Sequence, residues 1–445
     1  MSAPPNTPAG FTPDFLTRAM HDSGALPSGV SVVAAHATLL GGDSGNTGAQ
    51  IFRIALEYSS ATELPATVVL KFCDTSKMVT PTQRGNAIER GIILSTGYSD
   101  VRMIELETSF YSRFADVIAK PMAFRTPKIY YCGMSGGSTR LSLALFVAFG
   151  RLLSCKGAVI MEDLSAGETH DAIGSVPTPR FELVLQAMAR FHGYSAALLA
   201  RGQPGALGPL PRAFNYDLTY MTNGVARLVK RGMKPGVAQR VLNVWGNTDL
   251  AVLKNEPGTY EALRALEKRY GSHVYPMLAR RHAFPCVVHG DLHVGNFYFM
   301  PGEASAANMC SFDWQMWGTA PSPVQEVHYL FASHLLDDRQ APDRAEDERL
   351  LRMYHGALMQ ASGGVVDFPF ELLRRDFDVA SLDYLAAMMM RRARVDTPAS
   401  VLRSAKKKGA GRLVLGIQRL LKFRETVLLQ RAMQLHEINP AFEFA

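Results

Sequence analysis

The sequence is poor in cysteine and has no long hydrophobic run. Its five cysteines occur in 445 residues without a CxxC pair, so neither a disulfide framework nor a zinc site of paired cysteines is expected. The most apolar stretch, Leu141–Phe149, is far shorter than the ~20 residues that cross a bilayer. The N-terminus lacks the basic and apolar regions of a secretory signal. The sequence therefore predicts a cytoplasmic protein with free thiols and no membrane span.

Runs of like charge are also scarce. The formal net charge is only +7, and the clearest basic run is Lys406–Lys408. A solvated helix end or loop explains this triplet better than a nucleic-acid contact, so no nucleic-acid partner is expected. A mild basic surplus also suits an enzyme that attracts a polyanion such as ATP.

The chain changes character near residue 163. Before it, the Pro-rich Met1–Pro13 is expected to be loose, and one amphipathic helix is predicted over Val101–Lys120. Short apolar, β-branched runs predict strands at Ser31–Leu40, Ile51–Tyr58, Ala66–Phe72, Ile129–Cys132, Leu141–Phe149 and Gly157–Met161. After it, helical patterns dominate, beginning with Phe181–Leu199 and covering most of the chain from about residue 324. The predicted interruptions are a strand at Val287–Val288 and a hairpin of Phe297–Phe299 with Met309–Phe312.

The most informative segment is HGDLHVGNFYF at His289–Phe299, followed by FDW at Phe312–Trp314. Asp291 and Asn296 are five positions apart, and Asp313 comes after the next strand pair. A phosphoryl-transfer site needs three such groups. One carboxylate accepts the proton of the attacking hydroxyl, and an amide and a second carboxylate hold Mg²⁺ against the phosphates of ATP. The spacing therefore predicts Asp291 as the base and Asn296 and Asp313 as metal ligands.

The same segment permits a second interpretation, because His289 and His293 flank Asp291. A catalytic zinc site needs three protein ligands and an open position, and no second histidine cluster with matching spacing is present in the sequence. We therefore favour His289 as a structural residue that bonds the loop backbone.

A lysine, Lys71, lies inside the apolar strand VVLKF. Such a side chain is costly to bury unless it is paired. In kinases a strand lysine reaches the phosphates of ATP and pairs with a helix glutamate. Glu107 is the expected partner because it lies beside Leu106 on the apolar side of the predicted helix, and Glu105 is the competitor. An edge-strand lysine that blocks aggregation is the other interpretation.

Two more segments are candidates for nucleotide contact. GGDSGNTG at Gly41–Gly48 contains Gly42 and Gly45, whose backbone amides could approach phosphates, although an ordinary glycine-rich turn explains it equally well. GAVIMEDL at Gly157–Leu164 is an apolar strand that ends at two acids. In a kinase the backbone there would bind the adenine edge; by itself the segment is a strand end. The residues concerned are Met161, Glu162 and Asp163.

In this order the motifs resemble the aminoglycoside phosphotransferase and choline kinase superfamily, and most closely its ecdysteroid-kinase-like (CHK-kinase-like) branch. The resemblance rests on HGDLHVGN, FDWQMWG, ETSFY, LKF and VIMEDL. It implies an α+β, bilobal protein-kinase-like fold with a small β-rich N-lobe and a large, mainly helical C-lobe. The expected ranges are 1–30 for an N-terminal extension, 31–163 for the ATP-binding N-lobe, and 164–445 for the C-lobe with the catalytic loop and a helical substrate subdomain.

The sequence departs from the family pattern at two places. A long insert, Asp74–Asp100, separates Lys71 from Glu107, and Gln325-Glu326 stands where the family usually has an aspartate before its next apolar helix. The extra methylene could shift a structural hydrogen bond, but it does not touch the residues expected to transfer the phosphate.

The resemblance implies an ATP- and Mg²⁺-dependent phosphotransferase that moves the γ-phosphate to a hydroxyl of a small molecule. Asp291 would be the base, Asn296 and Asp313 the Mg²⁺ ligands, and Lys71, held by Glu107, the ATP contact. The alternative is a nucleotide-binding pseudokinase with a scaffolding role, which the intact set of residues argues against. A protein kinase is disfavoured because HGD replaces HRD and no A-P-E segment follows FDW. The acceptor and the oligomeric state are left open.

Overall fold

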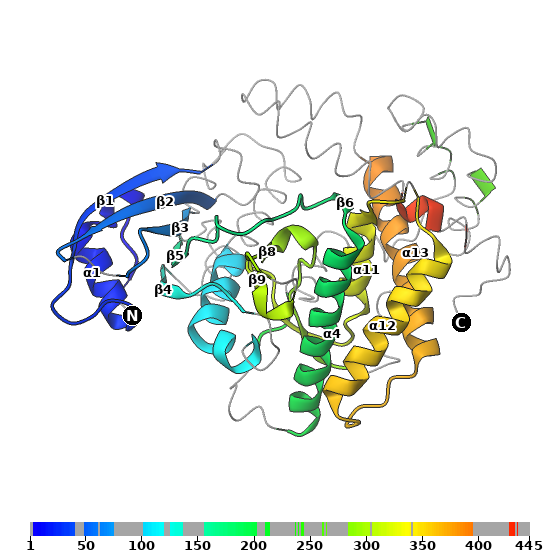
Figure 1. Ribbon diagram of the computed structural model, residues 1–445. Helices are drawn as coiled ribbons and strands as arrows, with labels where there is room; N and C mark the ends of the chain where they lie inside the picture. Colours follow the sequence, from blue (N-terminus) through cyan, green and yellow to red (C-terminus); the bar gives the residue numbers. More distant parts are fainter. Residues whose placement is uncertain are drawn as a thin grey trace, which may run out of the picture. The chain divides into compact units, whose positions relative to one another are not determined.

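The computed structural model (Figure 1) divides into two compact units. Unit 1 comprises Met1–Glu168 and Tyr298–Trp317, and unit 2 comprises Thr169–Phe297 and Gly318–Ala445. Apart from a few single residues, the structure describes residues 3–40, 49–60, 63–74, 101–119, 125–136, 155–202, 210–213, 284–302, 305–339, 341–394 and 427–431. The predicted strand Leu141–Phe149, most of the insert, and Gly42 and Gly45 lie outside the described residues. The lobe boundaries expected from the sequence stay a prediction.

Unit 1 contains an antiparallel sheet of five strands in the order β1-β2-β3-β5-β4. The strands are β1 (Val32–Leu39), β2 (Ala49–Tyr58), β3 (Thr67–Asp74), β4 (Ile129–Ser135) and β5 (Lys156–Glu162). Each coincides with a strand predicted from its apolar run, so these five predictions are confirmed. The predicted hairpin is also confirmed, as β8 (Phe297–Phe299) paired with β9 (Met309–Ser311).

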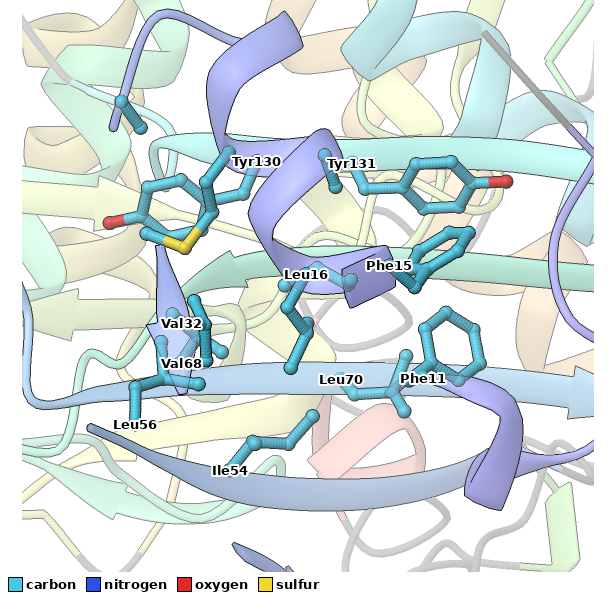
Figure 2. Close-up of a cluster of buried hydrophobic side chains, with 14 of the residues drawn as sticks. Phe11, Phe15, Leu16, Val32, Ile54, Leu56, Val68, Leu70, Tyr130 and Tyr131 are labelled. Carbon is cyan, nitrogen blue, oxygen red and sulfur yellow. The ribbon is translucent and has the colours of Figure 1, made fainter. Parts of the chain in front are cut away.

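One face of this sheet is covered by helix α1, Pro13–Asp22, which was not predicted. Phe15 and Leu16 of α1 pack with Leu70 of β3 in one buried cluster, and Figure 2 shows them among the strand side chains. Phe11 also belongs to this cluster and is only 5% exposed. The expectation that the chain is loose through Pro13 is therefore wrong from Phe11 onward, because burial of these apolar side chains stabilises the segment against the sheet.

The opposite face of the sheet carries Lys71. Side chains alternate between the two faces along a strand. The β3 residues in the cluster beneath α1 are Val68, Leu70 and Phe72. Lys71 lies between two of these residues and therefore points away from α1. The apolar pattern of the strand thus places one charged side chain on the second face.

The predicted amphipathic helix lies on this second face and is confirmed over residues 101–119. Its second half, Phe110–Ala119, is π-helical, a rare form that is frequent near functional sites. The helix approaches the sheet closely at Gly157 of β5, where an added Cβ would lie 2.2 Å from the Ile104 methyl group. Glu107 follows Ile104 by three residues and so lies on the same side of the helix.

Unit 2 is rich in helices. The longer helices among the described residues are α4 (Thr178–Ala200), α11 (Val324–Ser333), α12 (Arg344–Ser362) and α13 (Phe370–Arg394). Two short strand pairs join them, β7 (Cys286–Val288) with β10 (Gly318–Ala320), and β6 (Gly174–Val176) with β11 (His334–Leu336). The predicted helix at Phe181–Leu199, the strand at Val287–Val288 and the helices after residue 324 are confirmed within the described residues. Among those residues, no helix has both the length and the hydropathy of a membrane span.

Candidate active site

Lys71 in unit 1 lies between two carboxylates. Its ammonium group donates to the oxygens of Glu107 at 2.9 and 2.8 Å and to Oδ1 of Asp313 at 2.5 Å. Lys71 and Glu107 are buried, whereas the Asp313 side chain is 24% exposed. The structure therefore brings together three of the predicted site residues, from β3, from the helix on the second face and from the segment after β9.

The structure also decides which glutamate pairs with Lys71. Glu107 makes the contact, as the pattern of the helix favoured. Glu105 instead accepts from the Arg102 guanidinium at 2.8 Å, one turn earlier on the same helix. The packing of Ile104 on Gly157 fixes the rotation of the helix, and this rotation directs Glu107 toward β3.

Burial and charge oppose each other in this cluster. Burial alone would lower the pKa of Lys71, but the carboxylates of Asp313 and Glu107 outweigh it and hold the pKa above its ordinary value. Burial raises the pKa of Glu107, and the negative charge of Asp313 adds to this, while Lys71 pulls it down. Lys71 is therefore a permanent positive charge, and its presence is what favours the ionised form of Glu107.

Asp313 is held in an unusual backbone conformation. Its φ is 63°, the one positive value at a non-glycine residue in the described part of the chain, and such a conformation persists only where surrounding contacts impose it. Next to it, Trp314 stacks on Phe110 with ring centroids 4.0 Å apart and planes 5° apart. The Trp317 indole N–H donates to the Leu106 carbonyl at 2.6 Å. The helix that presents Glu107 thus also anchors the segment that presents Asp313.

The predicted adenine-binding connector uses its side chains for contacts inside unit 1. Met161 is buried. The Glu162 carboxylate accepts from Arg125 at 2.8 and 3.0 Å, and the Asp163 carboxylate lies 2.8 Å from Nε of Arg53. These ion pairs fix the end of β5.

The HGD segment follows β7 in unit 2. The Asn296 side-chain amide donates to the Asp291 carbonyl at 2.8 Å, and the Asp291 N–H donates to Nδ1 of His289 at 3.4 Å. His289 therefore makes the backbone contact expected from the sequence. Nε2 of His293 lies 3.7 Å from Oδ2 of Asp291, whose side chain is 23% exposed. The loop thus brings Asp291 and Asn296 together, with the Asp291 carboxylate partly open to solvent.

Two buried side chains from outside the loop hold its backbone. Glu326 of α11 accepts from the Gly290 N–H at 2.5 Å, and Nε2 of His334 accepts from the Val294 N–H at 3.0 Å. Gly290 has a φ of 88°, which a residue with a Cβ adopts only with strain. The bond from Gly290 shows that Glu326 reaches the loop, although its side chain is one methylene longer than the aspartate usual in the family. His334 was not predicted, since no local pattern connects it with a loop 40 residues earlier.

The proposed metal ligands suit Mg²⁺ in their chemistry. Asn296 uses its amide nitrogen for the Asp291 carbonyl, which leaves the amide oxygen for a cation, and Asp313 offers a partly exposed carboxylate. Both are hard oxygen donors, and Mg²⁺ binds through few protein oxygens together with waters and phosphates. Within the described ranges, no three His, Cys, Asp or Glu side chains are grouped to hold a metal ion.

The described residues thus place the Lys71–Glu107 pair in the strand-rich unit and the HGD loop in the helix-rich unit. Residues 142–363, about half of the chain, match the model of the ecdysteroid kinase-like family. This match confirms the superfamily resemblance expected from the motifs and, with the two units, the predicted α+β kinase-like fold. No curated protein sequence matches the chain.

Several solved structures are similar to this chain. A protein from Ralstonia eutropha described as a putative aminoglycoside phosphotransferase is 14% identical with a TM-score of 0.37, and the match covers 90% of this chain and 93% of that one. A choline kinase from Cryptosporidium parvum is 11% identical with a TM-score of 0.44, over 95% and 97% of the two chains. A macrolide 2'-phosphotransferase from Brachybacterium faecium is 12% identical with a TM-score of 0.34, over 90% and 98%.

Proposed function

We propose that the protein is an ATP- and Mg²⁺-dependent phosphotransferase that moves the γ-phosphate to a hydroxyl group of a small molecule. The observation that carries the proposal is the cluster of Lys71, Glu107 and Asp313, in which a buried lysine is paired with a helix glutamate and with the aspartate of FDW. A lysine held in this way presents a fixed positive charge to phosphates. The family match supports the same class of reaction.

In this proposal each predicted residue has one task. Lys71, oriented by Glu107, binds the phosphates of ATP, and Asn296 and Asp313 hold Mg²⁺, which when bound neutralises phosphate charge. Asp291 orients the acceptor hydroxyl and accepts its proton as the phosphoryl group leaves ATP. The partly exposed Asp291 carboxylate and the bonded loop backbone beneath it support this role, because positioning supplies much of the rate in such reactions.

The remaining nucleotide contacts are also part of the proposal. The adenine would lie at the connector of Met161, Glu162 and Asp163, and the backbone of Gly42 and Gly45 would approach the phosphates. The side-chain ion pairs of Glu162 and Asp163 support a rigid connector. The five free cysteines support a reducing, cytoplasmic location.

The proposal is tested by measuring ADP release from ATP with and without Mg²⁺ across a panel of alcohols. The panel contains an aminoglycoside, choline, a macrolide and an ecdysteroid, the acceptor types suggested by the names of the relatives. Mg²⁺-dependent ADP release that rises with at least one acceptor, and a phosphorylated product seen by mass spectrometry, are expected. ATP binding without transfer to any acceptor, over a panel widened to other alcohols, would favour a nucleotide-binding scaffold instead.

A further inference from the structure

Strand β1 forms one edge of the sheet in unit 1, and among the described strands it pairs only with β2 (Figure 1). Its eight residues, VVAAHATL, include no Lys, Arg, Asp, Glu or Pro, and those from His36 to Leu39 are exposed. Natural proteins usually protect a sheet edge with charges, proline or a cover, because its unpaired N–H and C=O groups are a template for another strand. The edge of β1 therefore lacks the usual side-chain protection.

The same strand carries the two most exposed large apolar side chains of the described residues. Val33 is 55% exposed and Leu39 is 42% exposed. The strand at the other edge of the sheet, β4, differs in this respect, because its residues from Tyr130 to Cys132 are buried. Two large apolar side chains on one unprotected edge favour a contact with another strand.

The hydrogen bonds to β2 determine which backbone groups of β1 point outward. The Leu40 N–H donates to the Ile51 carbonyl at 2.7 Å, and these two residues continue the register in which β1 pairs with β2. Bonded and non-bonded positions alternate along an antiparallel pair of strands. Counting back from Leu40, the N–H and C=O groups of His36 face β2, whereas those of Ala35 and Ala37 point away from the sheet.

The sequence of β1 is close to a palindrome about His36. At each step outward the residues on its two sides match in kind: alanine with alanine, a small residue with a small one, and a large apolar residue with another. The matched pairs are Ala35 with Ala37, Ala34 with Thr38, and Val33 with Leu39. If a second copy pairs antiparallel about a twofold axis at His36, the members of each pair lie opposite each other. Cross-strand partners of matching size stabilise such a pair of strands, which favours a second copy over an unrelated strand.

The direction of the backbone groups agrees with this axis. Residues that face each other in a bonded pair must both point their N–H and C=O groups toward the partner strand. Ala35 of one copy and Ala37 of the other meet this condition, and they do so twice by symmetry. An axis between two residues would instead set outward groups against inward ones and close no such bonds. The register shift of β1 lies at Val33, outside these central pairs.

We propose that the outer edge of β1 binds a second copy of this chain, with β1 against β1 in antiparallel orientation about a twofold axis at His36. The two sheets join into one, and the central alanines close about four backbone hydrogen bonds. One strand edge buries less than the ~1,200 Å² of a standard interface, so the dimer is weak and its population depends on concentration. The contact lies in unit 1 and goes beyond the proposed function.

The first test measures association of the full chain by sedimentation velocity. The wild type is expected to pass from monomer to dimer between about 1 and 100 µM, the range in which a weak pair dissociates. Ala37→Pro removes the outward N–H from both copies but no bond to β2, and proline is tolerated at such edge positions. Its dimer dissociation constant is expected to rise at least about tenfold. The matched control Ala37→Ser keeps the N–H and is expected to dimerise as the wild type does.

The second test examines the register by disulfide cross-linking with oxidised glutathione. In His36→Cys the two thiols face each other across the axis, at a Cα distance of about 4.5 Å that a disulfide spans. In the matched control Thr38→Cys, the two cysteines lie about 13 Å apart along the strands, too far for a disulfide. A covalent dimer is expected for His36→Cys and not for Thr38→Cys or the wild type, which gives the background of the five native thiols.

Three outcomes would overturn the proposal. They are a wild type that stays monomeric at about 100 µM, a folded Ala37→Pro that dimerises as tightly as the wild type, and a His36→Cys that cross-links no better than Thr38→Cys. Circular dichroism checks folding, and Ala37→Lys replaces a proline variant that does not fold, because a lysine on the edge opposes strand pairing. None of these measurements uses turnover, so failure of the dimer and failure of the proposed function are seen separately.

Discussion

The most informative perturbation of unit 1 is Lys71→Met, which removes the charge and keeps most of the side-chain volume. It leaves the buried Glu107 and the partly exposed Asp313 facing each other without their shared cation. Two oxygens bound at 2.8 and 2.5 Å to one nitrogen lie at most about 5 Å apart. At an effective dielectric constant of about 20, two unit charges at this distance repel by about 3 kcal/mol. Removal of one partner from a buried ion pair typically costs about 3–5 kcal/mol.

This cost is expected to depend on pH. In the wild type, burial already raises the pKa of Glu107 while Lys71 opposes the shift. In Lys71→Met the two causes that raise the pKa of Glu107, burial and the charge of Asp313, remain, and the opposing charge of Lys71 is gone. A group whose pKa is raised on folding contributes stability below its unfolded pKa and loses it as the pH rises through the folded value. We therefore expect Lys71→Met to lose about 3–5 kcal/mol at pH 8 and clearly less at pH 5, where Glu107 takes up a proton.

The assay is denaturant unfolding of both proteins at pH 5 and pH 8. It is followed by tryptophan fluorescence, because Trp314 and Trp317 are fully buried in unit 1. Lys156→Met is the control, since the Lys156 ammonium group donates a solvent-exposed hydrogen bond to the Asn6 carbonyl. Its loss of unfolding free energy should stay within about 0.5 kcal/mol. Lys71→Met combined with Glu107→Gln should recover part of the stability at pH 8. An equal loss at both pH values, or no recovery in the double variant, would refute the electrostatic argument.

Three further changes test other parts of the structure. Trp317→Phe removes the indole donor of the Leu106 carbonyl and should cost about 1–3 kcal/mol in the unfolding free energy of unit 1 by the same denaturation assay. Gly193→Ala should destabilise unit 2 by about 1–3 kcal/mol, because the added Cβ would lie 2.2 Å from the Leu358 carbonyl oxygen of α12. Gly356→Ala, on the open side of α12, should stabilise unit 2 by up to about 1 kcal/mol. If Gly193→Ala and Gly356→Ala changed the unfolding free energy in the same direction, the packing argument would be contradicted. A thiol reagent should label Cys73 first in the native protein, because the other four thiols are buried and burial raises the pKa of Cys132, Cys155 and Cys310 to about 12. Mass spectrometry of the labelled peptides checks this order.

The sequence predicted the strands of unit 1 because each is a short β-branched run with a clear period. It also placed Lys71 and a glutamate on facing elements, and it favoured Glu107 as the partner but left Glu105 open. That choice depends on the rotation of the helix, which the contact between Ile104 and Gly157 sets. Such a contact joins residues far apart in the chain and leaves no local pattern.

The features that the sequence does not predict, helix α1 and the contacts of Glu326, also depend on contacts between residues far apart in the chain. The sequence does not indicate helix α1, because the Pro-rich start of the chain predicts a loose segment, although Phe15 and Leu16 are fixed by burial against the sheet. In the sequence, Glu326 stands out only as a departure from the family pattern. Its partner His192 lies 134 residues away, and a hydrogen-bonded pair at that separation is visible only in the folded chain.

The central claim is that Asp291 accepts the proton of an alcohol during phosphoryl transfer from ATP. The most direct measurement compares wild type and Asp291→Asn in Mg²⁺-dependent turnover with an active acceptor, together with ATP affinity from equilibrium binding. Turnover is predicted to fall by several orders of magnitude, while the affinity for ATP stays nearly unchanged because Asp291 is assigned no contact with the nucleotide. Near-normal turnover of a folded Asp291→Asn variant would contradict the claim.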